Sequence, residues 1–212
     1  MVSPLQKSLV TGLILAGGRS SRMGGLDKGQ HLLGGQTLAC HVLRRLRPQV
    51  SAVAVSTSHH ADAYARLASD LQIWPDPTDL PGYSGPLAGM LSGLDHCTTE
   101  FLLTVPCDSP YLPLDLLERL SIELHSSAAH IAVAADRSSG EVHWHPVFCL
   151  MHRTVRAALR EFMRDDGRKI VQWLQTQGAA VAVFDRPGDD PQAFANINTR
   201  EQLLALEALR NA

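Results

Sequence analysis

Short apolar runs rich in β-branched residues alternate with amphipathic helical patterns along most of the chain. Parallel strands joined by crossover helices produce this alternation, because each strand must be followed by a return segment before the next one begins. The expected strands span residues 10–16, 52–57, 71–74, 101–105, 130–134, 147–151 and 180–184. Helical spacing recurs in residues 39–46, 87–94, 117–124 and 155–162. The sequence therefore predicts a three-layer α/β/α sandwich around a mostly parallel sheet.

The chain of 212 residues has the length of one domain. Neither a repeat nor a linker divides it, and a chain of this length buries roughly 70% of its unfolded surface. Thr199 and Gln202 form a capping box ahead of a final helix that we expect to reach Leu209. We expect residues 1–212 to form a single domain, with residues 1–8 disordered.

Composition excludes several classes of protein. A formal net charge of −2 disfavours general binding to nucleic acids, so a phosphate ligand must be met by local charge. No apolar stretch is long enough to cross a membrane, and the N-terminus lacks the pattern of a signal peptide. The cysteines form no C-x-x-C pair, which indicates reduced thiols and a cytoplasmic protein. They are Cys40, Cys97, Cys107 and Cys149.

A glycine-rich segment with several cations follows the first expected strand. Paired glycines Gly17 and Gly18 allow backbone N–H groups to approach a ligand closely, and Arg22 and Lys28 add positive charge. The segment matches neither the P-loop nor the G-x-G-x-x-G fingerprint. It is typical of a cradle for a triphosphate, and the alternative is a surface turn with incidental arginines.

Polar groups also follow the other expected strands, at what must be one edge of a parallel sheet. They are Ser56, Asp76 and Asp108. Asp108 stands between Pro106 and Pro110, which stiffen its turn. Mg²⁺ takes one or two carboxylates together with phosphate oxygens, so Asp108 is the expected metal ligand. The alternative is that Asp108 caps the helix beginning near Pro113.

Four motifs in order resemble the molybdenum cofactor guanylyltransferase family, within the nucleotidyltransferases of glycosyltransferase-like Rossmann fold. The resemblance runs from about Leu13 to the end of the chain. The motifs are Leu15-Ala16-Gly17-Gly18 with Arg22-Met23-Gly24-Gly25 and Asp27-Lys28-Gly29, then Gly85-Pro86-Leu87-Ala88-Gly89-Met90, Pro106-Cys107-Asp108-Ser109-Pro110-Tyr111-Leu112-Pro113, and Asn196-Ile197-Asn198-Thr199.

The resemblance implies roles for these residues. Lys28 would contact the phosphates with Arg22, and Asp108 would bind nucleotide through Mg²⁺. The other implied nucleotide-binding residues are Leu15, Ala16, Gly17, Gly18, Ser56 and Asp76. At Ser56 the family has asparagine, so a shorter hydroxyl replaces an amide. Gly17 stands where cytidylyl relatives carry alanine, and the added room favours a purine over the cytosine of CTP. Of the purine nucleotides, we expect GTP rather than ATP.

The resemblance also implies, less directly, which residues lie near the second substrate, the phosphorylated acceptor. His145 belongs to a His-Pro pair of the family before a strand, where a structural role is the alternative. Arg168 and Lys169 could meet a pterin phosphate or form a solvated helical turn. Asn196 and Asn198 match a motif placed near the metal or the second substrate, or they could simply frame the helix cap at Thr199.

The implied reaction transfers GMP from GTP to the terminal phosphate of molybdenum-molybdopterin and releases pyrophosphate. Lys28, Arg22 and Asp108 would be its catalytic residues, with Mg²⁺ as cofactor. The implied partners are proteins that supply molybdopterin and molybdoenzymes that receive the product, and we expect a monomer. Two alternatives stay open: a nucleotidyltransferase using CTP or another phosphorylated acceptor, and a non-catalytic carrier of GTP or pterin.

Overall fold

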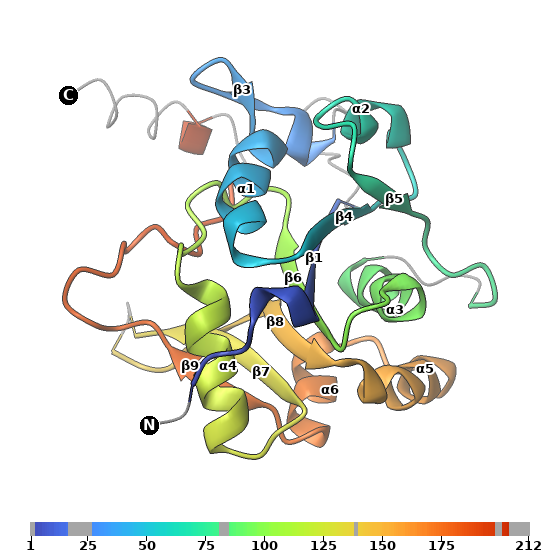
Figure 1. Cartoon of the computed structure of the whole chain (residues 1–212), viewed down its shortest axis with the longest axis vertical. Coiled ribbons are helices and arrows are strands. Elements are labelled where there is room, and N and C mark those ends of the chain that lie inside the picture. The colour runs from blue at the N-terminus through green and yellow to red at the C-terminus, as the bar shows by residue number, and fades with distance from the viewer. Residues whose placement is uncertain (1–2, 17–26, 81–84, 138–139, 198–200, 204–212) are drawn as a thin grey trace.

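A twisted seven-stranded sheet forms the centre of the molecule, in the order β5-β4-β1-β6-β8-β7-β9 (Figure 1). The computed structural model describes residues 3–16, 27–80, 85–137, 140–197 and 201–203. Among the strands of the sheet, β8 alone runs antiparallel to its neighbours. The strands are β1 (Val10–Leu15), β4 (Ala52–Ser56), β5 (Gln72–Trp74), β6 (Phe101–Pro106), β7 (Ile131–Asp136), β8 (His143–His152) and β9 (Ala180–Val183). This confirms the predicted fold class.

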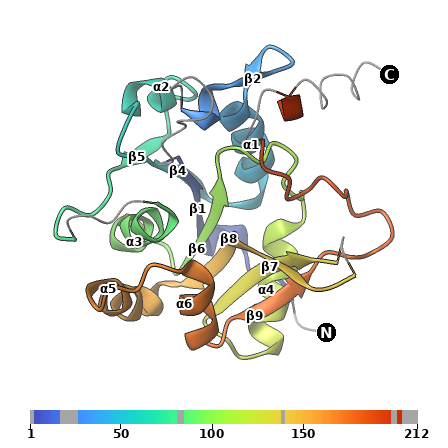
Figure 2. The same ribbon diagram turned by 180° about the vertical axis from the view of Figure 1, so that it is seen from behind.

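Helices cover both faces of the sheet (Figures 1 and 2). The apolar residues of α1 and α4 pack together in the core on one face, whereas those of α3, α5 and α6 pack on the other. The helices are α1 (Leu38–Leu46), α2 (Ala61–Ala65), α3 (Pro86–His96), α4 (Leu116–Ser126), α5 (Arg156–Arg164) and α6 (Ile170–Thr176). Single turns of 3-10 helix occur at Lys7–Leu9, Lys28–Gln30, Arg47–Gln49 and Arg153–Val155.

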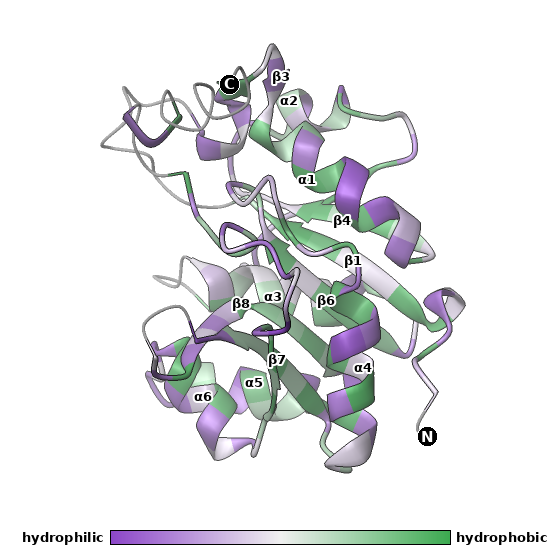
Figure 3. Ribbon diagram, turned by 90° about the vertical axis from the view of Figure 1, so that its left-hand side faces the viewer, coloured by the Kyte–Doolittle hydropathy of each residue, from purple (hydrophilic) through white to green (hydrophobic). Residues whose placement is uncertain are grey.

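The central strands are buried on both sides, which explains their continuous apolar sequences. All residues of β1 are buried, and β6 is buried up to its last residue. Figure 3 shows hydrophobic strands between helices whose outer faces are hydrophilic. Because β1 and β6 lie side by side near the middle of the sheet, the loops that follow them start from a rigid base.

The structure extends the prediction in four places. It adds a short hairpin of β2 (Leu32–Leu33) and β3 (Gln36–Thr37), and it adds α2 and α6. It also begins β8 four residues before the expected start at 147, at His143. An irregularity in the pairing of β7 with β8 allows this, since Val133 pairs with Cys149 but Ala134 pairs with His145. His145 therefore lies within a strand and not before one.

The N-terminal segment differs from the disorder expected for residues 1–8. Residues 3–9 are described, with a turn of 3-10 helix at Lys7–Leu9. The Leu5 N–H donates to the Ser121 hydroxyl oxygen of α4 at 3.2 Å, and this contact ties the segment to the helix.

At the other end of the chain, residues 201–203 are helical, whereas Thr199 and Leu209 lie outside the described residues. None of the helices in the described part of the chain combines the length and the hydropathy needed to span a bilayer.

Candidate active site at the carboxyl ends of the strands

A pocket of about 220 Å³ opens where β1, β4 and β6 end. The register explains this position, because Leu15 pairs with Ser56 on one side and with Pro106 on the other. The strand order also reverses here, since successive strands proceed from β1 toward β5 and then return to β6 on the opposite side. The described lining residues are Leu15, Ala16, Lys28, Ser56, Asp76, Gly85, Pro86, Gly89, Pro106, Cys107, Asp108, Val147 and Asn196.

Asp108 and Lys28 meet in this pocket. The Lys28 Nζ lies 3.3 Å from the Asp108 Oδ2, although the two residues come from different loops. Asp108 is only 5% exposed. Burial raises the pKa of its carboxyl, and the nearby Lys28 ammonium opposes that shift. The helix α4 begins at Leu116 with Asp115 as its N-cap, so Asp108 does not cap it and is available to the pocket.

Asp76 lies on the rim beside the end of β4. Its Oδ1 accepts a hydrogen bond from the Ser56 hydroxyl at 3.4 Å, and its Oδ2 accepts one from Ser58. The serine at position 56 thus orients a carboxylate of the pocket.

The amino end of α3 also opens onto the pocket, through Gly85, Pro86 and Gly89. Gly85 has a φ of 103°, a conformation that suits glycine. A Cβ at Gly89 would lie 2.6 Å from the Leu15 Cδ2 and 3.1 Å from the Ser56 Oγ. The helix therefore packs closely against β1 and β4, where a Cβ at Gly89 would require the Leu15 side chain to shift, and its positive end faces the pocket.

We divide the pocket into two sides. The strand-end wall consists of Leu15, Ala16, Ser56 and Asp108, and the strap is the segment 184–197 that follows β9. The strap reaches the pocket at Asn196, whose Oδ1 accepts a hydrogen bond from the Ser109 hydroxyl at 2.6 Å. The next residue, Ile197, donates its N–H to the Asp108 carbonyl oxygen at 2.9 Å.

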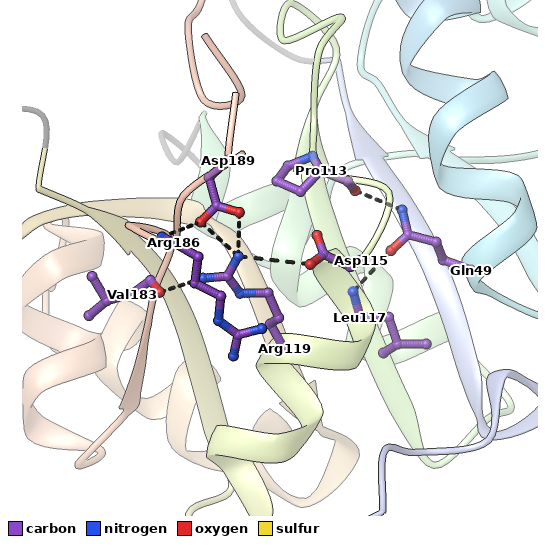
Figure 4. Close-up of polar contacts among 8 residues, drawn as sticks. All are labelled: Gln49, Pro113, Asp115, Leu117, Arg119, Val183, Arg186 and Asp189. Carbon is purple, nitrogen blue, oxygen red and sulfur yellow. Dashed lines mark hydrogen bonds and ion pairs between the residues drawn. The ribbon is translucent and has the colours of Figure 1, made fainter. Parts of the chain in front are cut away.

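Arg119 anchors the other end of the strap (Figure 4). This arginine of α4 is 5% exposed, and its Nη1 donates to both carboxylate oxygens of Asp189 at 2.8 Å. Its Nη2 donates to the Val183 carbonyl oxygen at 2.6 Å, and its guanidinium lies 3.8 Å from the centre of the Phe184 ring. Asp189 also accepts the Arg186 N–H at 2.9 Å. A buried charge thus holds the strap against α4.

Three residues expected on the acceptor side do not line the pocket. The His145 Nε2–H donates to the Asp136 carboxylate at 2.8 Å, and the ring stacks on the strap residue Phe194, with ring centres 4.4 Å apart. Burial lowers the pKa of His145, although Asp136 opposes that shift. Arg168 pairs with Asp166 at 2.7 Å ahead of α6, and Lys169 is the N-cap of that helix. Of the acceptor-side set, Asn196 alone borders the pocket among the described residues.

The structure brings together most of the residues expected around the nucleotide. Leu15, Ala16, Lys28, Ser56, Asp76 and Asp108 all line the pocket. Gly17, Gly18, Arg22 and Asn198 lie outside the described residues. Sequence reasoning missed the lining role of Gly85, Pro86 and Gly89, although their motif was the signal that could have revealed it.

The side chains of the pocket fit a divalent cation such as Mg²⁺ that is bound by a carboxylate and by phosphate oxygens at the same time. Asp108 offers a buried carboxylate toward the pocket, and Lys28 is the one cationic side chain among the described lining residues. In the described part of the chain, no three His, Cys, Asp or Glu side chains are grouped to hold a metal. A cation held by Asp108 could complete its coordination with phosphate oxygens and water, which is how Mg²⁺ is commonly bound with nucleotides.

Comparison with known proteins extends these observations. Residues 12–180 match the family model of the MobA-like NTP transferase domain. A molybdenum cofactor guanylyltransferase of Acidovorax ebreus is 47% identical over 206 residues, covering 94% of this chain and 96% of that protein. The enzyme of the same name from Albidiferax ferrireducens is 45% identical over 205 residues, covering 93% and 95%.

A solved structure gives the same fold. Molybdopterin-guanine dinucleotide biosynthesis protein A of Archaeoglobus fulgidus superposes with a TM-score of 0.73 at 19% identity, covering 95% of this chain and 98% of that one.

Proposed function

We propose, since this chain belongs to the family of MobA-like NTP transferase domains, that it transfers GMP from GTP to the terminal phosphate of molybdenum-molybdopterin. The products are pyrophosphate and the guanine dinucleotide form of the cofactor. The observation that carries this proposal is the Lys28–Asp108 pair, 3.3 Å apart in a pocket at the carboxyl ends of the strands. A cation and a buried carboxylate at one point suit a metal-bound triphosphate.

The reaction is an in-line displacement at the α-phosphorus of GTP. An oxygen of the acceptor's terminal phosphate forms the new P–O bond, and the bond from the α-phosphorus to the bridging oxygen of pyrophosphate breaks. The protein needs no nucleophile, because positioning and charge neutralisation suffice. We assign Lys28 and Arg22 to the phosphates that leave. Leu15, Ala16, Gly17, Gly18, Ser56 and Asp76 would surround the rest of the nucleotide.

We assign Asp108 to Mg²⁺. Because burial raises the pKa of this carboxyl, its ionised form favours a nearby cation, and Lys28 supplies only one charge. When bound, Mg²⁺ would neutralise charge that develops on the phosphate oxygens. Asp108 would hold the ion, and Lys28 would keep its own charge at the adjoining phosphates.

The strap supports a role for the segment beyond the matched residues 12–180. Asn196 reaches the pocket from there, so we propose that residues 1–212 act as one nucleotidyltransferase domain. The acceptor would approach on the side of Asn196 and Asn198, with His145, Arg168 and Lys169 outside direct contact. Free thiols at all four cysteines suit the cytoplasm that we expect.

A pyrophosphate-release assay tests the proposal. Purified protein with Mg²⁺ and molybdopterin should release pyrophosphate with GTP and much less with CTP or ATP. Mass spectrometry should identify the guanine dinucleotide product. Release with CTP, or with a different phosphorylated acceptor only, would replace the proposal with a neighbouring nucleotidyltransferase. Tight GTP binding without release in any combination would indicate a carrier.

A further inference from the structure

We propose that the hydroxyl of Tyr64, acting through the carboxylate of Asp27, positions Lys28 for contact with the phosphates of the nucleotide. Tyr64 is then a positioning residue of the reaction, although it does not border the pocket. The proposal rests on the proposed function, because Lys28 needs a phosphate to contact. It assigns a purpose to a buried polar network that the chemistry itself does not use.

Lys28 lies on a single helical turn whose amino end is capped by Asp27. The turn of 3-10 helix spans Lys28–Gln30, and Asp27 is its N-cap. The Asp27 Oδ1 accepts the Gly29 N–H at 2.9 Å, and the Asp27 carbonyl accepts the Gln30 N–H at 3.0 Å. A turn this short depends on its cap for its orientation.

Tyr64 fixes that cap from a distant part of the chain. It comes from α2 and is 0% exposed, and its hydroxyl donates to the same Asp27 Oδ1. Burial, together with the neighbouring Cys107 and Asp27, raises the pKa of Tyr64 far above its usual range. The phenol therefore stays protonated and remains a donor. One carboxylate oxygen thus joins the turn to the core.

Gly29 packs closely against Tyr64 and Cys107. A Cβ at Gly29 would lie 2.4 Å from the Tyr64 hydroxyl oxygen and 3.1 Å from the Cys107 Cβ. Cys107 immediately precedes Asp108. Tyr64 and Gly29 therefore bring the turn that bears Lys28 against the loop that bears Asp108, and the 3.3 Å contact between those two side chains follows.

The alternative is that Tyr64 serves the core only as a large ring. A ring alone does not require the hydroxyl to lie on the cap of the turn, and phenylalanine would then serve equally well. The buried Asp27, at 7% exposure, also requires donors, and Tyr64 supplies one of them. The two interpretations predict different GTP binding when only the hydroxyl oxygen of Tyr64 is removed.

Tyr64→Phe makes that test. We expect kcat/KM for GTP to fall about tenfold, the scale of losing one hydrogen bond to a charged group. The dissociation constant for GTP should rise similarly, whereas that for guanosine, which has no phosphates, should change less than about twofold. In the Lys28→Ala background, Tyr64→Phe should have almost no further effect on GTP. Ser121→Ala is the matched control, because it removes another buried hydroxyl, on α4, and should leave both constants unchanged.

A second pair of variants leaves Tyr64 intact, in case its substitution prevents folding. Asp27→Asn keeps an oxygen that accepts both hydrogen bonds and should stay within about threefold of the original protein, while Asp27→Ala should match Tyr64→Phe. Equal losses for GTP and guanosine, or no loss in either series, would overturn the proposal. Failure of the original protein to release pyrophosphate would instead contradict the proposed function, and the two binding constants would still report on Lys28.

Discussion

Asp108 on the strand-end wall and Asp189 on the strap are both held beside a cation, but their environments differ. Burial raises the pKa of Asp108, and Lys28 reverses that shift only in part. Burial also acts to raise the pKa of Asp189, but hydrogen bonds from Arg119 and from the Arg186 backbone, together with their charges, lower it overall. The described surroundings of Asp108 thus disfavour its negative charge overall, whereas those of Asp189 favour the negative charge of that carboxylate.

This contrast separates a binding group from a structural one. A buried carboxylate with one monovalent partner among the described residues is costly to ionise and favours a ligand that brings more positive charge. A carboxylate held by two guanidinium hydrogen bonds stabilises the fold and fixes the strap. The following predictions test that division, in order of expected effect.

Asp108→Ala should have the largest effect on activity. It removes the carboxylate that we assign to Mg²⁺, so turnover should fall at least about 100-fold, the scale of losing one electrostatic stabiliser. Pyrophosphate release at saturating GTP and Mg²⁺ measures the change. Asp62→Ala, on the exposed side of α2, is the control and should behave like the original protein. Unchanged activity of Asp108→Ala would place the metal elsewhere.

Arg119→Met should act mainly on stability and on the acceptor. It removes the charge that holds Asp189 and Val183, so the free energy of unfolding should fall by about 2 kcal/mol, as expected when one partner of a partly buried pair is lost. The KM for molybdopterin should rise while the KM for GTP stays nearly constant. Denaturant unfolding and steady-state kinetics measure these changes. Arg119→Lys should be intermediate, because it keeps the charge without the planar fork. Equal changes in both KM values would show that the strap supports the whole pocket.

Asp189→Asn should reveal the lowered pKa of Asp189. The folded pKa lies below the ordinary value of about 3.9 for aspartate. The stabilisation is therefore fully present above that value and is lost as the pH falls through the folded pKa. The original protein should be more stable than Asp189→Asn by about 1 kcal/mol at pH 7, and the difference should shrink in strong acid. A difference that persists unchanged to low pH would mean that the charge of Asp189 is unimportant.

Asp108→Asn should have the smallest effect on stability, with the opposite sign. Because the folded pKa of Asp108 is raised, ionisation of this carboxyl reduces stability as the pH rises from the unfolded pKa through the folded one. Removing the charge should therefore slightly raise the melting temperature at pH 7 without Mg²⁺ or nucleotide, while activity is lost. Thermal unfolding with and without Mg²⁺ and GTP measures this. A lower melting temperature would indicate that the ion pair with Lys28 is a net stabiliser.

Sequence reasoning located the strand-end wall well because parallel strands obey simple rules. Hydrophobic runs gave β1, β4 and β6, and their common direction brought Leu15, Ser56 and Asp108 to one edge. The family motif suggested Lys28 as well. Those residues come together through register, which a single sequence partly encodes.

The same reasoning could not predict the contacts that hold the strap. Arg119 and Asp189 are 70 positions apart, and neither stands in a periodic pattern that indicates the other. Tyr64 lies in α2, a helix that the sequence pattern did not predict, and its hydrogen bond to Asp27 spans 37 positions. The extension of β8 also depends on an irregular pairing with β7, so His145 was expected before a strand that in fact contains it. Local sequence patterns could not predict these polar pairs, because their members lie far apart in the chain.

A crystal structure with Mg²⁺ and a non-hydrolysable GTP analogue would test the Lys28–Asp108 site most directly. We expect the triphosphate to lie within contact of the Lys28 ammonium, with the ion on the Asp108 carboxylate and the guanosine along Leu15, Ser56 and Asp76. A triphosphate bound away from both Lys28 and Asp108, with the 3.3 Å contact between them undisturbed, would contradict the assignment of this pocket.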